Sequence, residues 1–157
     1  PMGGKVALIA GSLALTDHRD RKEGFVGLMA EEFPAVTCIG PFEGHAERAG
    51  TATLATGLFA THPDLAGIYN LGAGNAGLIA ALEDSGRAGR VRVIAHELSD
   101  TTRRGLGSGA IDVVLDQNPA GEIRAAIAAA RALVLGDGEG FRGEPIEIGI
   151  FLRDNLR

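Results

Sequence analysis

The chain of 157 residues and 16.2 kDa is long enough for one domain with a hydrophobic core and too short for two domains of ordinary size. Its net charge of −5 and its lack of basic runs argue against a nucleic-acid-binding surface on this chain. It has no apolar run long enough for a membrane span and no stretch with the pattern of a secretion signal. The single cysteine, Cys38, cannot form an internal disulfide, and its apolar neighbours predict a buried side chain in a reducing compartment.

Five short apolar runs have the length and the content of β-branched residues that are typical of buried strands. They are KVALIA (5–10), AVTCIG (35–40), AGIYNL (66–71), RVRVIAH (90–96) and AIDVVLD (110–116). Continuous apolar runs, in contrast to alternating ones, indicate strands that are covered on both faces. We therefore expect these strands to be parallel.

Most of the predicted strands are followed by a segment with helical periodicity. The apolar positions that carry this period are Phe25, Leu28, Met29 and Phe33; Ala52, Ala55, Leu58 and Phe59; Leu78, Ile79 and Leu82; and Ile123, Ile127, Ala130, Leu133 and Val134. The last helix should begin with Asn118 as its cap and Pro119 at its first position, and end at Gly136. Strands and helices that alternate at this spacing predict an α/β three-layer sandwich with a mostly parallel sheet.

The C-terminal tail has a different pattern. In EPIEIGIFLRD (144–154) aliphatic residues recur at every second position from Ile146 to Leu152. This is the period of a strand with one less buried face. We therefore expect a strand at the edge of the sheet.

Polar side chains stand where the predicted strands end. These are Ser12, Asn70, His96 with Glu97, and Asp116 with Gln117. Parallel strands bring such ends to one edge of the sheet, which is where folds of this kind bind ligands. A hydroxyl, amides, a carboxylate and an imidazole, joined by Arg21 from the charged run DHRDRKEGF (17–25), suit a small, neutral, polyhydroxylated ligand. Any one of these residues, taken alone, is equally well explained as a solvated loop residue.

The sequence contains no clear pattern for catalysis or for metal binding. No serine stands in a G-x-S-x-G nucleophile elbow. His18, His45, His62 and His96 lie on different segments without the spacing of metal ligands, which favours a surface or capping role for each. We expect neither an enzyme nor a bound metal or cofactor.

One motif predicts a different function. Gly72, Gly74 and Gly77 in LGAGNAG match the G-x-G-x-x-G pattern between a strand and a helix, and Glu97 follows Gly77 by 20 residues. This arrangement would suit a dinucleotide with Glu97 on its ribose. The motif lies in the third unit of strand and helix, which leaves little chain for a catalytic domain. A dinucleotide-binding enzyme is therefore the less favoured alternative.

Several longer stretches, taken together, resemble a known family. A domain found in two classes of protein has similar sequences to five stretches of this chain: GKVALIAGSLALTDHRDRKEGF, the YN that ends the third strand, VRVIAHELSD, IDVVLDQNP and the closing IEIGIFLRDN. It is the effector-binding domain that lactose-repressor-type transcriptional regulators share with periplasmic sugar-binding proteins of the ribose-binding type. In that family two α/β lobes close on a sugar. The resemblance covers nearly all of this chain but only the second half of such a domain, which implies the C-terminal lobe.

The resemblance implies three parts in the chain. Residues 1–117 would form the core of strands and helices, residues 118–138 a crossover helix that packs on the N-terminal lobe, and residues 139–157 a C-terminal strand and tail. Without that lobe, the apolar stripe of the crossover helix would lack its natural partner. We therefore expect a homo-oligomer, with self-association or a swapped dimer through residues 119–157.

The resemblance also implies roles for individual residues. Arg21, three residues before a Gly-Phe pair, matches the family arginine that hydrogen-bonds sugar hydroxyls. Asn70 matches the asparagine at the end of the third strand of this lobe. Glu97 stands where the family usually has an aspartate, and Gln117 matches the glutamine at the crossing into the other lobe.

The sequence departs from the family pattern next to Asn70. Leu71 replaces an acidic residue that the family commonly has there, and the extra length of GAGNAG allows Asn75 to share the amide role of Asn70. The ligand site expected from the sequence comprises Ser12, Arg21, Asn70, Asn75, His96, Glu97 and Gln117.

The favoured function is the ligand-sensing part of a sugar-responsive transcriptional regulator in the cytoplasm, which binds a sugar-like effector between two lobes without catalysis. DNA would be bound only by a headpiece outside this chain, and ligand binding would act on that headpiece by stabilising the closed lobes. The alternative is the sugar-binding component of an importer in the periplasm. A helix-turn-helix ahead of Pro1 would indicate the regulator, and a secretion signal would indicate the importer.

Overall fold

A computed structural model describes residues 3–72, 74–136, 143 and 145–156. Its centre is a sheet of six strands in the order β2-β1-β3-β4-β5-β6. The strands are β1 (Gly4–Ala10), β2 (Val36–Glu43), β3 (Leu65–Asn70), β4 (Arg92–His96), β5 (Val113–Asp116) and β6 (Gly149–Phe151). β1 to β5 are parallel, as predicted, and β6 pairs with β5 in the antiparallel direction.

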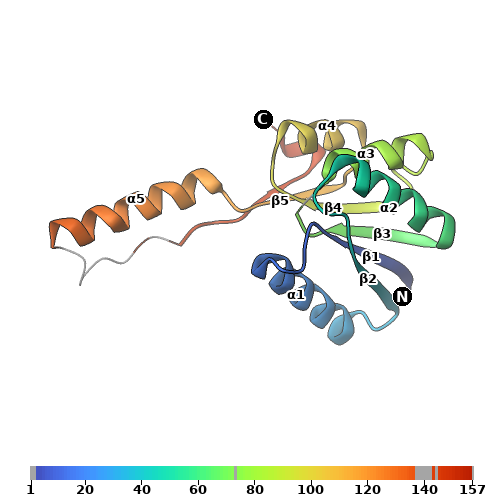
Figure 1. The fold of residues 1–157 in the computed structure, drawn as a ribbon, viewed down its shortest axis with the longest axis horizontal. Helices are drawn as coiled ribbons and strands as arrows, with labels where there is room; N and C mark the ends of the chain where they lie inside the picture. The colour runs from blue at the N-terminus through green and yellow to red at the C-terminus, as the bar shows by residue number, and fades with distance from the viewer. Residues whose placement is uncertain (1–2, 73, 137–142, 144, 157) are drawn as a thin grey trace.

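Four helices cover the two faces of the sheet (Figure 1). α1 (Thr16–Glu32) lies on one face, and α2 (Arg48–Thr61), α3 (Asn75–Asp84) and α4 (Asp100–Ser108) form a layer on the other. The predicted α/β three-layer sandwich is therefore confirmed. No helix among the described residues is both long enough and apolar enough to span a membrane.

The main core lies between the sheet and the layer of α2, α3 and α4. Its most deeply buried side chains include Ile9, Ile68, Leu78, Val93 and Leu106. Gly77 allows α3 to approach α2 closely, because a Cβ at this position would lie 2.1 Å from the carbonyl oxygen of Arg48. The close approach places the first residues of α2 and α3 beside each other at one edge of the sheet.

The face of the sheet that α1 covers has a smaller core, built around Tyr69 and Leu71. Phe25 of α1 packs on Tyr69 with ring centroids 4.8 Å apart. The apolar stripe is only partly covered, because Leu28 of α1 is 46% exposed and Phe33, the residue after the helix, is 48% exposed. Within the described residues α1 is the only helix on this face, so only the side of α1 that meets the sheet is covered.

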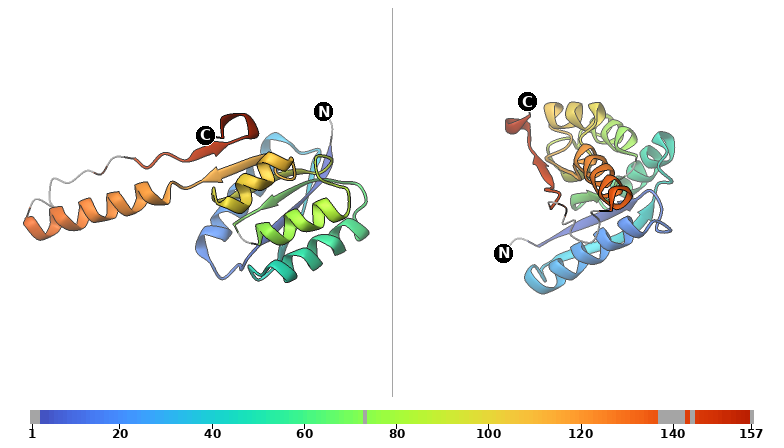
Figure 2. Two further views of the ribbon diagram at one scale, coloured as in Figure 1. Left: turned by 90° about the horizontal axis from the view of Figure 1, so that it is seen from above. Right: turned by 90° about the vertical axis from the view of Figure 1, so that its left-hand side faces the viewer.

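α5 (Pro119–Leu135) extends away from the sheet (Figures 1 and 2). As predicted, Asn118 caps it by accepting a hydrogen bond from the backbone N–H of Gly121 at 3.0 Å, and Pro119 is its first residue. Gly136 ends the helix in the left-handed conformation, with φ of 83°. None of the residues of α5 is buried, which leaves aliphatic side chains such as that of Ile127 in solvent.

The two outer strands of the sheet differ from the predictions in extent and burial. β6 is an edge strand, as predicted, but it contains only residues 149–151, and the side chains of Ile146 and Ile148 before it are exposed. The predicted boundary at residues 138 and 139 lies outside the described residues. Cys38 in β2, at the other edge, is only partly buried, and this burial raises the pKa of its thiol.

Candidate functional site

The carboxyl ends of β1, β3 and β4 meet at a hollow of about 380 Å³. Its lining includes Gly11, Ser12, Leu15, Asp17, His18, His45, Ala46, Gly72 and Glu97. Because parallel strands direct their carboxyl ends to one edge, residues far apart in the sequence come together here. Ser12 and Glu97 are the two sequence-predicted site residues that line the hollow.

Arg21 is held against the backbone at the same corner of the fold. Its Nη1 donates a hydrogen bond to the carbonyl oxygen of Leu71, and its Nη2 lies 3.3 Å from Oδ2 of Asp17. A Cβ on Gly72 would lie 2.8 Å from Nη1 of Arg21 and 2.9 Å from Nε2 of His18. Gly72 has φ of +148°, so glycine is required here both by the backbone conformation and by the space that the two side chains occupy.

His18 is a buried residue of the site, although the sequence favoured a surface or capping role for it. Its side chain lies in the first turn of α1 and faces the sheet, so the residue is only 4% exposed. Nδ1 lies 3.1 Å from the carbonyl oxygen of Ser12, and Nε2 lies 4.0 Å from Oδ2 of Asp17. The anchoring of Nδ1 to Ser12 positions the imidazole ring beside Gly72 at the hollow.

Asn70 and Asn75 bond to each other next to the hollow. Nδ2 of Asn70 donates to Oδ1 of Asn75 at 2.7 Å, and Nδ2 of Asn75 donates to the carbonyl oxygen of His96 at 3.2 Å. Oδ1 of Asn70 accepts from the backbone N–H of Gly72 at 3.4 Å. The two amides thus tie the end of β3 to the start of α3 and the end of β4. Neither side chain is among those that line the hollow.

His96 is buried behind this network and is 6% exposed. Its Nε2 lies 2.8 Å from Oη of Tyr69, and the two rings are 5.6 Å apart. Burial, and then the nearby charges of Arg21 and His18, lower the pKa of His96 to about 4, so the imidazole is neutral at physiological pH. Burial also raises the pKa of the Tyr69 hydroxyl, which therefore keeps its proton.

Glu97 and Gln117 follow neighbouring strands but stand in different surroundings. The backbone of Glu97 is fixed, because its N–H donates to Leu115 at 2.9 Å and its carbonyl oxygen accepts from Oγ1 of Thr102 at 2.7 Å. Its carboxylate is exposed at the hollow. Gln117 is half-buried after β5, at the start of the segment that leads into α5, and does not line the hollow.

The expected site therefore divides into three groups. Ser12 and Glu97 line the hollow, with Arg21 next to Gly72 of its lining; Asn70, Asn75 and His96 form a bonded network beside it; and Gln117 lies one strand further along. The sequence analysis did not assign Asp17, His18, His45 or Gly72 to the site, although they line the hollow. For Asp17 and His18 the available signal was the charged run that begins α1 at the ligand edge.

The glycines of LGAGNAG have structural roles in this fold. A Cβ on Gly74 would lie 2.0 Å from Oγ1 of Thr51, and Gly77 meets the backbone of Arg48 in the same way. Close packing of α3 on α2 therefore accounts for these two glycines without a dinucleotide. Among the described residues, no three His, Cys, Asp or Glu side chains are grouped so that they could hold a metal ion.

Residues 1–138 match the family described as periplasmic binding protein domain, and the chain belongs to this family. Solved structures with the same fold include an ABC transporter solute-binding protein from Agrobacterium vitis bound to α-D-tagatopyranose, with 22% identity and a TM-score of 0.84. Another is a carbohydrate transporter solute-binding protein from Agrobacterium radiobacter in complex with D-arabinose, with 19% identity and a TM-score of 0.89. A third is a glucose-galactose binding protein from Geobacillus stearothermophilus, with 22% identity and a TM-score of 0.84.

The chain spans about half the length of these solved proteins. Each comparison covers 98% of this chain but only 51%, 52% and 55%, respectively, of the other chain. No curated protein sequence matches the chain.

Proposed function

We propose that this chain forms one lobe of the solute-binding component of a sugar importer, and that the hollow at the ends of β1, β3 and β4 is its half of the sugar site. The observation that carries the proposal is that Ser12 and Glu97 line one hollow, with Arg21 beside Gly72 of the same lining, in a lobe of the periplasmic binding protein family. The solved proteins with this fold that are described above bind monosaccharides.

The chemistry of the hollow suits the hydroxyl groups of a sugar. Glu97 offers an exposed carboxylate that accepts hydrogen bonds, and the Arg21 guanidinium offers donors in a fixed plane. Asp17 balances the charge of Arg21 at 3.3 Å, so the ligand does not have to supply an anion to pair with this arginine. Binding makes and breaks no covalent bond, and we assign no catalysis to these residues.

We further propose that α5 is the crossover element of a two-lobed protein, with residues 1–117 as the core of this lobe, 118–138 as the crossover helix and 139–157 as the returning tail. The lack of any buried residue in α5 supports this assignment, since an apolar stripe is normally covered. A sugar between the lobes would stabilise their closed arrangement, because it contacts both of them only in that state. Without a second lobe, we propose that α5 associates with a second copy of the chain through residues 119–157.

The effector-binding domain of a cytoplasmic regulator is the second candidate. The sequence analysis favoured it over the importer. Two of the solved structures described above are solute-binding proteins of transporters and the third is a sugar-binding protein, which supports the importer over the regulator. An importer component would act in the periplasm. The segment that precedes Pro1 in the full open reading frame discriminates the two candidates, since only the regulator has a helix-turn-helix there.

The test is a titration of the isotope-labelled chain with D-arabinose, D-tagatose, D-fucose and D-glucose, followed by amide chemical shifts. We expect saturable shifts at Ser12, Gly72 and Glu97, with millimolar affinity because one lobe supplies only part of the contacts. Glu97→Gln should weaken binding by about tenfold, because it removes a charged acceptor of hydrogen bonds. Glu31→Gln, which changes an exposed glutamate at the far end of α1, is the matched control and should bind normally.

Two results would contradict the proposal. One is the absence of saturable shifts with every sugar of the panel. The other is binding that Glu97→Gln leaves unchanged, or shifts that cluster away from the ends of β1, β3 and β4.

A further inference from the structure

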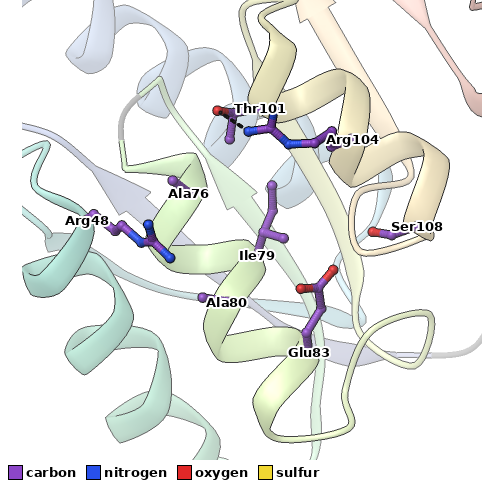
Figure 3. Close-up of a pocket in the computed structure, with 8 residues that line it drawn as sticks. All are labelled: Arg48, Ala76, Ile79, Ala80, Glu83, Thr101, Arg104 and Ser108. Carbon is purple, nitrogen blue, oxygen red and sulfur yellow. Dashed lines mark hydrogen bonds between the residues drawn. The ribbon is translucent and has the colours of Figure 1, made fainter.

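A second hollow, of about 370 Å³, lies on the outer surface of the layer formed by α2, α3 and α4 (Figure 3). α3 forms its floor with the short side chains of Ala76 and Ala80 and with Ile79 between them. Arg48 at the start of α2 and Arg104 of α4 stand on opposite sides of this floor. We call this feature the helix-layer groove.

The two arginines of the helix-layer groove lack a carboxylate partner. Within the described part of the chain, neither Arg48 nor Arg104 forms an ion pair, and the only side-chain bond of Arg104 runs from Nη2 to Oγ1 of Thr101 at 3.4 Å. Both side chains are exposed. The chain as a whole has a net charge of −5, whereas this groove carries two arginines without a carboxylate partner, so its local charge is opposite in sign to that of the chain.

The helix dipoles add to the positive potential at the end of the groove where Arg48 and Arg104 lie. Arg48 is the first residue of α2, Ala76 the second residue of α3 and Thr101 the second residue of α4. The positive ends of three helix dipoles therefore lie on the same side as the arginines. An anionic group would meet two guanidinium groups, the Thr101 hydroxyl and these dipoles together.

The opposite end of the groove carries a negative charge. Glu83 lines it and lies seven residues after Ala76 on α3, which is about 10 Å at the rise of an α-helix. An extended peptide advances about 3.3 Å per residue, so roughly three residues span this distance. A free carboxylate would fill only the arginine end and would leave the apolar floor at Ile79 uncovered.

We propose that the helix-layer groove binds a short acidic peptide segment of a partner protein. An acidic side chain of the segment lies between Arg48 and Arg104, and an apolar side chain that follows it covers Ile79. Charge complementarity selects this partner, because the arginine end of the groove attracts a carboxylate that the net negative charge of the chain otherwise repels. The groove is separate from the hollow at the strand ends, since the two share no lining residue.

The test uses an acetylated Asp-Glu-Ala-Leu peptide amide with a fluorescent label, measured by polarisation at low salt. Its uncharged counterpart, Asn-Gln-Ala-Leu, and free glutamate are the comparison ligands. The chain variant is Arg48→Gln with Arg104→Gln, and the matched control is Arg19→Gln with Arg90→Gln, which removes the same charge from exposed positions outside the groove and outside α5. Circular dichroism confirms that each variant is folded.

The acidic peptide should bind the unmodified chain and the control with equal affinity. It should bind the variant with Arg48→Gln and Arg104→Gln about tenfold more weakly, and its binding to the unmodified chain should weaken in high salt. Glu83→Lys should strengthen binding, which supplies a second result that unfolding could not mimic. Equal binding by the chain and the double arginine variant would overturn the proposal. The proposal would also be overturned if the uncharged peptide bound as tightly as the acidic peptide, or if free glutamate at the same concentration as the acidic peptide displaced it.

Discussion

The buried histidine of the site predicts how stability depends on pH. His96 is 6% exposed, contacts Oη of Tyr69 at 2.8 Å, and has a pKa of about 4 in the folded chain against 6.5 for an ordinary histidine. Between these two pH values the unfolded chain takes up a proton that the folded chain does not bind. The free energy of unfolding should therefore decrease as the pH falls from about 6.5 to about 4.

The shift in the pKa of His96 sets the size of this effect. One pKa unit corresponds to about 1.4 kcal/mol, so the full shift corresponds to at most about 3.5 kcal/mol, and residual access of solvent makes the measured value smaller. His96→Gln retains a polar group next to Tyr69 but does not titrate. We expect the variant to lose about 2 kcal/mol less stability than the unmodified chain between pH 7 and pH 4.

Urea denaturation at a series of pH values, followed by circular dichroism, measures this difference. His45→Gln is the matched control, because it makes the same substitution at an exposed histidine. Its pH dependence should follow that of the unmodified chain. If His96→Gln and the unmodified chain lose equal stability over this range, His96 is not held neutral by the fold and the reasoning is refuted.

Further substitutions test helix packing, the site and the exposed helix. Gly77→Ala places a Cβ 2.1 Å from the carbonyl oxygen of Arg48 and should lower the free energy of unfolding, measured by urea denaturation, by about 2 to 3 kcal/mol. Gly57→Ala, which has no neighbour within 4 Å, should raise the free energy of unfolding by about 0.5 to 1 kcal/mol. Gly72→Ala should abolish the sugar-dependent amide shifts, because a Cβ there displaces the side chains that meet at the hollow. Light scattering should show a dimer that Ile127→Asp, at a position of α5 that is 63% exposed, converts to monomer; a monomeric unmodified chain would contradict the proposed self-association.

Local patterns in the sequence account for much of the fold. Continuous apolar runs predicted the five parallel strands, and the cap and first residue of α5 were read correctly at Asn118 and Pro119. These features depend on residues close together in the chain, such as the side chain of Asn118 that bonds three residues ahead. α4 was not predicted as a helix, although Ser99 and Thr102 cap its start reciprocally.

The site was predictable only in part. The alternation of strands and helices indicated which edge of the sheet would gather polar residues, and Ser12 and Glu97 were found there. The sequence could not show that Asn75 would bond to Asn70 and to the backbone of His96, since those contacts depend on how α3 packs beside the ends of two strands.

The order of residues in this chain determined the identity of its strands and helices, the direction of the sheet and the edge at which polar side chains accumulate, because periodicity and capping act over a few neighbouring residues. Tertiary structure alone decided which of those side chains reach the hollow. His18 is buried because its helix meets the sheet there, Gly72 leaves room for Arg21, and α5 remains uncovered because no described segment packs on its apolar stripe. Each of these outcomes depends on contacts between segments distant in sequence, which local patterns do not encode.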